Sequence, residues 1–378
     1  MPSRIAERLG RVRLALHDTG LDAFLVTDLT NVHYLTGFVG TAGAVLVAPS
    51  TCRLIVDFRY MTAAKEVLAG VPDVEVEVVE RSYDETIVGL LQHDQALRTG
   101  IEAASMPVKR FNELSAGLAR GGAGAPAGTL APVLVPTERV VEALRVIKDA
   151  DEIAALQEAG RRLSRIACRV HELVRPGRRE QDIAWEIDVA LRDAGFSRPA
   201  FDTIVASGPN SALPHARPTA RALEAGDAVV LDFGGVYNGY CVDLTRTVQL
   251  GAPSTALRHL YEAVAAAQEA AIQAVRPGVR ASAIDAAARE ALASRGLGKA
   301  FGHGTGHGLG LEVHEEPRIS HAVPGLRDDE IAPGMVFTIE PGAYVPGLGG
   351  VRIEDDFLVT EDGCEPLTSA PVLIEVRA

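Results

Sequence analysis

Short apolar runs alternate with amphipathic stretches over the first 120 residues. The runs "DAFLVT", "GAVLVA" and "CRLIVDF" have the length of buried strands, whereas "RYMTAAKEVLAG", "YDETIVGLLQ" and "PVKRFNELSAGLA" carry apolar residues at helical spacing. Alternation of these two element types predicts an α/β domain.

The stretch "RGGAGAPAGTLAPVLVP", residues 120–136, is too rich in glycine and proline for the interior of an element and predicts a linker. We therefore expect two domains, over residues 1–132 and 133–378. The second opens with a long helix over 149–174, because acidic residues suited to a helix N-terminus stand at its start and "RPG" follows its end.

A weak internal repeat runs through the second domain. "VRPGRREQDIAWEIDVALRDAGF" resembles "VRPGVRASAIDAAAREALASRGL", and each copy predicts a turn followed by a helix. "AGDAVVLDFG" likewise resembles "PGMVFTIEPG", so that Asp232 corresponds to Glu340, with each acid 6 residues after a glycine, Gly226 or Gly334. The repeat predicts two similar halves that face one another.

Each half carries a pair of acids in apolar surroundings. Asp232 and Asp243 lie in two strand-like runs separated by a glycine-rich turn, and Glu354 follows Glu340 by 14 residues. An unpaired buried ion costs roughly several kcal/mol, and four carboxylates in one place would take up protons unless cations neutralised them. The paired acids therefore predict a metal site.

Histidines that could complete this site stand in "FGHGTGHGLGLEVHEEP", residues 301–317. His303 and His307 have the spacing of a helical zinc site, but the surrounding glycines argue against a helix. "GLGLEVHE" instead predicts a strand that leads away from His307. His314 in "VHEEP" also matches His215 in "PHARP", as the repeat requires.

Four carboxylates and one imidazole are mostly hard donors, which favour manganese or cobalt over a thiolate-type zinc site. Two ions about 3.5 to 4 Å apart would hold a bridging hydroxide for hydrolysis of an acyl bond, while the other histidines bind substrate, pass a proton or stabilise the oxyanion. Arg352, two residues before Glu354, would share a strand face with it and offset the acids. Taken singly, each residue has a simpler explanation, such as a solvated acid, a core histidine or a cross-strand ion pair.

Charge and composition narrow the class of partner. The net charge of -13, from 37 basic and 50 acidic residues, argues against a nucleic-acid groove and against anionic membranes. No run of 18 apolar residues and no apolar signal-peptide core occurs, so we expect a cytoplasmic protein. The four cysteines are scattered, which predicts reduced thiols mostly in the core.

Four motifs in order carry a family resemblance. "SGPNSALPHARPT", "LDFGGVYNGYCVDLTRT", "FGHGTGHGLGLEVHEEP" and "FTIEPGAYVPGLGGVRIED" resemble the proline-specific pita-bread metallopeptidases, the Xaa-Pro aminopeptidases (aminopeptidase P) and Xaa-Pro dipeptidases (prolidases). "YLTGFVGTAG" and "VDFRY" resemble the family's N-terminal domain. The resemblance implies an α+β fold, in which an N-terminal α/β creatinase-like domain precedes a pseudo-twofold pita-bread domain.

The resemblance also implies roles for the site residues. It makes Glu340 both a metal ligand and a proton shuttle, and it implies two divalent ions, first of all Mn²⁺ with Co²⁺ or Zn²⁺ possible, and a homodimer. The implied metal ligands are Asp232, Asp243, His307, Glu340 and Glu354. The implied residues around the substrate are His215, His303, His314 and Arg352.

The substrate would be a small peptide with proline at its second position. An X-Pro bond is a tertiary amide without an N–H, and the proline ring needs an apolar slot. Tyr344, Phe201 and Val313 lie near the motifs, but we expect them in the core.

Two proline-specific activities remain open. "GFVGTAG" favours an aminopeptidase, whereas the short spacing of Glu340 and Glu354 occurs in both kinds of enzyme. A dipeptidase needs a cation for the proline carboxylate, for which Arg59 and Arg53 are candidates. Hydrolysis of a non-peptide amide or phosphorus ester would be a side activity.

Two other classes fit less well. A methionine aminopeptidase would lack the N-terminal domain. A non-catalytic protein-binding module of the same fold predicts a broken ligand set, whereas every ligand position is filled here.

Overall fold

The computed structural model describes residues 2–121, 132–372 and 374–377. The chain divides into two compact units, Met1–Arg145 and Val146–Ala378. The boundary expected after residue 132 precedes this division by 13 residues (145 − 132), because strand β6 (Val133–Thr137) pairs with β5 (Arg98–Glu102) in the sheet of the first unit. Of the expected linker, residues 122–131 lie outside the described residues.

The first unit is built on a six-stranded sheet in the order β4-β3-β2-β1-β5-β6. Strand β2 runs antiparallel to both neighbours, and the other pairs are parallel. The remaining strands are β1 (Ala23–Val26), β2 (Ala44–Val47), β3 (Cys52–Val56) and β4 (Val74–Val78). The helices are α1 (Pro2–Thr19), α2 (Leu29–Thr36), α3 (Met61–Val67), α4 (Tyr83–His93), α5 (Val108–Gly121) and α6 (Glu142–Arg145). The predicted α/β domain is confirmed.

Strand β6 overlaps the end of the stretch that was expected to be a linker. It is an edge strand, so Pro136 can occupy it although proline has no N–H to donate. The prediction that residues 133–136 are irregular was therefore wrong.

The long helix predicted over 149–174 is shorter. Helix α7 (Ala150–Ala167) begins with a capping box, in which Asp149 accepts from the backbone of Glu152 and Glu152 accepts from the backbone of Asp149. Beyond Ala167 the chain tightens into a 3-10 turn, η1 (Val170–Leu173), with a backbone bond from Arg169 to Ile166 of 2.8 Å.

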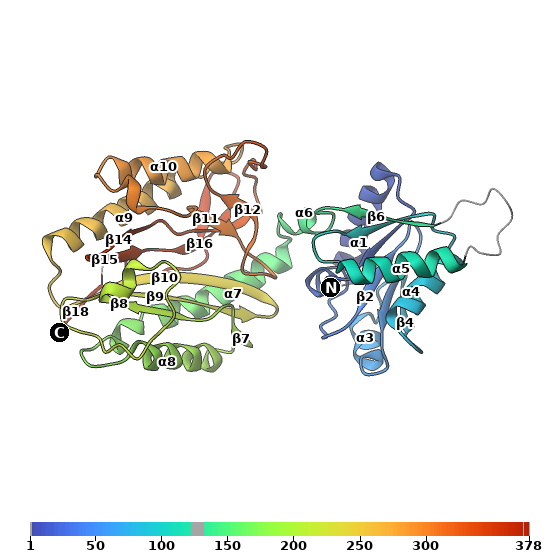
Figure 1. Cartoon of the computed structure of the whole chain (residues 1–378), viewed down its shortest axis with the longest axis horizontal. Helices are drawn as coiled ribbons and strands as arrows, with labels where there is room; N and C mark the ends of the chain where they lie inside the picture. The colour runs from blue at the N-terminus through green and yellow to red at the C-terminus, as the bar shows by residue number, and fades with distance from the viewer. Residues whose placement is uncertain (1, 122–131, 373, 378) are drawn as a thin grey trace. The chain divides into compact units, whose positions relative to one another are not determined.

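The second unit holds two five-stranded sheets and a two-stranded sheet. Figure 1 shows α7 and α8 on one side of these strands and α9 and α10 on the other. One sheet has the order β18-β10-β9-β7 with β8 paired to β9, the second has the order β12-β11-β13-β16-β17, and β14 pairs with β15.

The elements follow the sequence repeat in where the helices begin, but the matched strands differ in length between the two halves. The helices are α8 (Glu180–Asp193), α9 (Thr255–Ala274) and α10 (Ala281–Ala293), with 3-10 turns η2 (Gly208–Ala212) and η3 (Gly298–Ala300). The strands are β7 (Arg198–Pro199), β8 (Ile204–Ser207), β9 (Ala228–Tyr237), β10 (Tyr240–Leu250), β11 (Gly306–Gly308), β12 (Glu315–Ile319), β13 (Val336–Ile339), β14 (Gly342–Val345), β15 (Gly349–Arg352), β16 (Asp355–Val359), β17 (Cys364–Pro366) and β18 (Ile374–Val376).

The repeat is visible as matched turns. Gly177 before α8 and Gly278 before α10 both have a positive φ, of 82° and 88°. Gly226 before β9 and Gly334 before β13 do as well, at 98° and 85°. These left-handed positions favour glycine, which explains why glycines recur at matched places in both halves.

The cysteines and the helices bear on two further expectations. All four cysteines are free; Cys52 and Cys241 are buried, Cys364 is half-buried and Cys168 is exposed. The expectation of a mostly buried set thus holds for two of them. Among the described residues, no helix is both long and apolar enough to span a bilayer.

Candidate metal centre and active site

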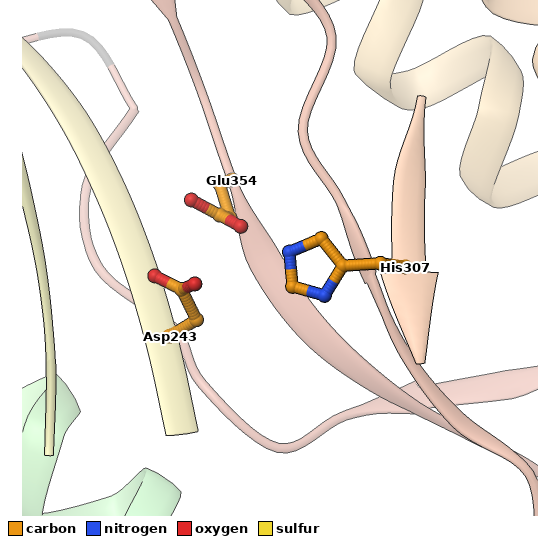
Figure 2. Close-up of side chains that lie close together, drawn as sticks. All are labelled: Asp243, His307 and Glu354. Carbon is orange, nitrogen blue, oxygen red and sulfur yellow. The ribbon is translucent and has the colours of Figure 1, made fainter. Parts of the chain in front are cut away.

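Three side chains from distant parts of the second unit converge on one place. Asp243 comes from β10, His307 from β11 and Glu354 from the residues between β15 and β16, and their ligand atoms all lie within 4.8 Å of one another. Figure 2 shows the three side chains pointing toward a common space. Two carboxylates and one imidazole at this separation can hold a divalent cation.

The long hairpin of β9 and β10 positions the two aspartates. Asp243 lies opposite Gly234, and Asp232 lies opposite Thr245. Both aspartates are buried, and the Oδ1 atom of each has no hydrogen-bond partner in the structure. Buried carboxylate oxygens are normally satisfied, so these two atoms are suited to a cation.

Close backbone packing positions His307. A Cβ atom at Gly306 would lie 1.9 Å from the carbonyl oxygen of Thr338, and one at Gly308 would lie 2.1 Å from that of Glu316, so only glycine fits on either side. His307 Nδ1 donates to the carbonyl of Gly308 at 3.1 Å, which leaves the lone pair of Nε2 available to a metal. Burial lowers the pKa of His307 to about 4, which keeps the ring neutral.

The strand predicted to lead away from His307 is not formed. His307 itself lies in the short strand β11, residues 310–314 form a bend, and β12 begins only at Glu315. The register shifts between His307 and Gly308, and the close approach of the Glu316 carbonyl to Gly308 turns the chain there. As predicted from the glycines, His303 and His307 do not share a helix.

Contacts from strand β10 hold Glu354 in place. Its Oε2 accepts from Thr245 Oγ1 at 2.6 Å, and its backbone N–H donates to the carbonyl of Thr245 at 3.1 Å. Strand β15 ends at Arg352, so the expectation that Arg352 and Glu354 share one strand was wrong. Both side chains nevertheless reach the Thr245 hydroxyl, which accepts from Arg352 Nε at 3.2 Å and donates to Glu354. Arg352 also donates from Nη2 to Asp232, an acid of the opposite half.

Burial of the acids, together with their close grouping, raises their pKa values. Burial, followed by repulsion from the other carboxylates, raises the pKa of Asp243 and of Glu354 well above the usual range. Burial raises the pKa of Glu340 to about 8, with Arg352 opposing the shift and Asp232 adding to it. Glu340 Oε1 lies 3.7 Å from His307 Nε2. Four clustered carboxyls and one arginine leave excess negative charge when the acids are ionised, and divalent cations would neutralise it.

A chain of hydrogen bonds leads from Arg352 to His303. Arg352 Nη1 donates to the hydroxyl of Tyr344 at 2.8 Å, and that hydroxyl lies 3.1 Å from His303 Nε2. His303 Nδ1 donates to Gly304 O at 2.8 Å, so Nε2 accepts from the tyrosine. Burial lowers the pKa of His303 to about 4. His303 is thus a neutral ring in a fixed orientation.

The other two predicted histidines, His215 and His314, are exposed to solvent. The rings of His307 and His314 meet edge to face with centroids 4.3 Å apart. His215 is exposed, and its charge acts on both His303 and His314, which places it near them. The structure therefore gathers all nine predicted residues in one region, with the two exposed histidines where a substrate can reach them.

Three residues that sequence analysis did not assign also belong to this region. Tyr344 was expected in the core, yet its hydroxyl joins Arg352 to His303; its place on β14, paired to the strand of Arg352, was the available signal. Thr245 binds Glu354, and Asp356 Oδ2 accepts from the backbone of Asp243 at 2.9 Å.

The candidate cations for a proline carboxylate are both engaged within the first unit. Arg53 donates to Asp94, and Arg59 donates to Asp57 at 2.9 Å through Nε. Of the two, Arg59 is the more exposed, at 58% of its side chain.

Comparisons with known proteins agree with this geometry. The sequence model described as metallopeptidase family M24 matches residues 154–361, and that of the creatinase/prolidase N-terminal domain matches residues 8–147. The Xaa-Pro dipeptidase of Pyrococcus furiosus is 34% identical over 367 residues, covering 96% of this chain and 97% of the relative.

Two solved structures share the architecture over almost the whole chain. An Xaa-Pro dipeptidase from Bacillus anthracis superposes with a TM-score of 0.91 at 34% identity, covering 98% of this chain and 100% of that one. An X-Pro aminopeptidase from Thermotoga maritima superposes with a TM-score of 0.84 at 33% identity, covering 94% and 98%.

The fold and the cluster of acids and histidine define a metal-dependent peptidase with the pita-bread architecture. The chain belongs to metallopeptidase family M24. The fold class and the family predicted from the motifs are confirmed, and so is its assignment as a metalloexopeptidase.

Proposed function

We propose that this protein is a metal-dependent Xaa-Pro peptidase, which hydrolyses the bond between an N-terminal residue and a following proline. The convergence of Asp243, His307 and Glu354 supports this most directly, since it assembles donors from both halves of a family M24 domain. Asp232 and Glu340 complete the proposed ligand set, and Asp232 contributes to the raised pKa values of the other three acids.

The ligand set fits two divalent ions, for which we propose manganese, with cobalt or zinc as ions that the same donors accept. When bound, such ions supply Lewis acidity and lower the pKa of the attacking water. Unpaired buried oxygens on Asp232 and Asp243 and the free Nε2 lone pair of His307 support this fit.

The chain's own residues divide the remaining work. Burial raises the pKa of Glu340 to about 8 in the metal-free protein; once bound cations have ionised it, Glu340 is suited to take a proton from water and return it to the leaving proline nitrogen. That return matters because the leaving group is a secondary amine that must be protonated. His303 is neutral, and its Nε2 accepts a hydrogen bond from Tyr344 that an N–H donor of the substrate could replace. His215 lies near His303 and His314, and His314 packs on His307, so both exposed histidines are placed to contact the substrate.

Two substrate ranges remain candidates. The motif "GFVGTAG" favours an aminopeptidase, whereas the similarity to the dipeptidases of Pyrococcus furiosus and Bacillus anthracis favours a prolidase. We propose the aminopeptidase as the main activity and the dipeptidase as its alternative. A non-catalytic binding module is disfavoured, because all five donors are present.

The deciding experiment is a parallel assay of the manganese-loaded protein on Ala-Pro and Ala-Pro-Ala, with a chelated control. Cleavage of both, or of the tripeptide alone, supports the aminopeptidase. Cleavage of the dipeptide alone supports the prolidase. Absence of metal-dependent cleavage of either would contradict the proposed function.

We also propose a homodimer and a cytoplasmic location. Reduced cysteines are typical of the cytoplasm, and all four cysteines here are free. For the dimer, support comes from a groove between α7, η1 and α8, where Trp185 is 70% exposed and Val189 42% exposed.

The walls of this groove carry opposite charges. Arg165 lies on the α7 side and Asp193 on the α8 side, and neither has an ion-pair partner among the described residues. We propose that, in a dimer formed about a twofold axis at this groove, Arg165 of one copy faces Asp193 of the other and the reverse. Sedimentation should show that Arg165→Glu weakens the dimer and that adding Asp193→Arg restores it; dimers unaffected by Arg165→Glu would assign the interface elsewhere.

A further inference from the structure

Residues that join the two halves of the catalytic unit determine how far apart the metal donors stand. Asp243 belongs to the sheet of β9 and β10, whereas Glu354 lies between strands of the two other sheets. An isolated backbone bridge between Thr245 and Glu354 links the two segments. Any shift at this junction changes the separation of the two carboxylates.

Arg246 spans this junction. Its Nη1 donates to the carbonyl of Thr245 at 2.9 Å and to that of Glu354 at 2.6 Å. Its Nη2 donates to Asp355 Oδ1 at 2.7 Å and to Ala370 O at 2.8 Å, and its Nε lies 3.2 Å from that same carbonyl. One planar group therefore binds the backbone on both sides of the metal site.

The guanidinium has little freedom. Arg246 is 1% exposed and is the largest fully buried side chain of the described residues. Each of its three nitrogens has an acceptor, so the five N–H groups of the fork are matched by the surrounding oxygens. Gln268 donates to the other oxygen of Asp355 at 3.2 Å, which holds the counter-ion in place.

Arg246 lies on the face of β10 opposite to the metal donors. Side chains alternate along a strand, so Asp243 and Thr245 share one face while Arg246 takes the other. It can therefore act on the site only through the residues that it holds.

We propose that Arg246, with Asp355 as its counter-ion, is a positioning residue that sets the distance between the Asp243 and Glu354 carboxylates and thereby the metal affinity. This inference rests on the proposed metal-dependent function. Lysine retains the charge of Arg246 but provides one ammonium in place of a planar fork, so it cannot hold both backbones at once.

The test uses Arg246→Lys and Asp355→Asn in the full chain. Metal-free protein is titrated with Mn²⁺ by calorimetry, and the Co²⁺-loaded protein is examined by visible absorption, which reports ligand geometry. Partners that orient metal ligands typically contribute about 10- to 100-fold in affinity, so Arg246→Lys should bind Mn²⁺ at least about 10-fold more weakly with an altered Co²⁺ spectrum. Asp355→Asn should change both in the same direction.

Arg145→Lys is the matched control. Arg145 is also buried, 3% exposed, and donates to Asn31 Oδ1 at 2.8 Å, but it lies in the first unit. It should lower thermal stability and leave Mn²⁺ affinity unchanged.

The outcomes separate the two proposals. Wild-type affinity and spectrum in Arg246→Lys would overturn the positioning role, and if that variant does not fold, the same result in Asp355→Asn would overturn it. Failure of the wild-type protein itself to bind Mn²⁺ would instead contradict the proposed function.

Discussion

The two halves of the catalytic unit supply metal donors in different ways. In the first half, Asp232 and Asp243 sit inside strands of 10 and 11 residues that pair along their whole length. In the second half, His307 lies in a strand of three residues, and Glu340 and Glu354 stand just outside strands. A long ladder orients side chains by its own hydrogen bonds, whereas donors at strand ends depend on contacts from elsewhere.

Those outside contacts are specific. Thr305 accepts the backbone N–H of Glu340 at 2.7 Å and is itself bound by Asp285 at 2.8 Å, while Thr245 holds Glu354. The repeat thus supplies equivalent acids, and the second half requires additional residues to place them.

The largest effect is expected when a metal donor is removed, and one donor from each half can be tested. Asp243→Ala and Glu354→Ala should each abolish peptide hydrolysis with manganese present, a loss on the order of 1000-fold or more, because several kcal/mol of transition-state stabilisation depend on the bound ions. Initial rates on Ala-Pro and Ala-Pro-Ala measure this, with Asp362→Ala, an exposed acid of the same unit, as control. Normal turnover of either peptide by Asp243→Ala would contradict the proposed metal site.

A glycine substitution tests how strongly the second half depends on close backbone packing. In Gly306→Ala the new methyl group would meet the Thr338 carbonyl, so we expect a loss of about 1–3 kcal/mol of stability together with displacement of His307 and a large loss of activity. Gly89→Ala in α4, where a Cβ atom meets nothing within 4 Å, should be neutral or stabilising. Denaturant unfolding and rates give both readouts, and an unchanged stability of Gly306→Ala would contradict this account of β11.

Metal binding should release protons from donors in both halves. Asp243, Glu340 and Glu354 have raised pKa values, so at pH 7 the metal-free site carries protons that cation binding must release. Release of one proton makes Mn²⁺ affinity rise about tenfold per pH unit, and this rise should continue at least up to the pKa of about 8 of Glu340. Calorimetry in buffers of different ionisation enthalpy counts the protons; pH-independent affinity between 6 and 8 would show that the acids are already ionised.

The same protons predict how stability depends on pH. A carboxyl with a raised folded pKa favours the folded state while it is protonated, so the metal-free protein should lose stability as the pH rises from about 5 through about 8. Bound Mn²⁺ should remove most of this loss. Thermal unfolding with and without metal gives the comparison.

The smallest expected effect concerns the Tyr344 hydroxyl, which joins His303 to Arg352. Tyr344→Phe removes the hydroxyl between Arg352 and His303 and should lower kcat/KM by about 3- to 10-fold, the worth of one hydrogen bond, with Mn²⁺ affinity unchanged. Tyr237→Phe, at a tyrosine outside the site, is the control. An unaltered kcat/KM would leave Tyr344 a packing residue, as the sequence suggested.

Element types and donor chemistry were accessible from the sequence alone. Apolar spacing depends on neighbours a few residues apart, so it identified the strands that contain Asp232 and Asp243 and the helices of both repeat copies. The acids indicated a metal site because carboxylates in apolar strands require cations. The ordered motifs then identified the family, which the comparisons confirm.

Only the tertiary structure decided which donors meet and what holds them. Arg352 contacts Asp232 across 120 residues of sequence, and Arg246 binds the backbone of Glu354 across 108. Such contacts depend on how sheets pack, and local periodicity contains no information about that. The bend after His307 has the same origin, because the carbonyl that approaches Gly308 belongs to β12, a strand whose pairing no neighbouring residue specifies.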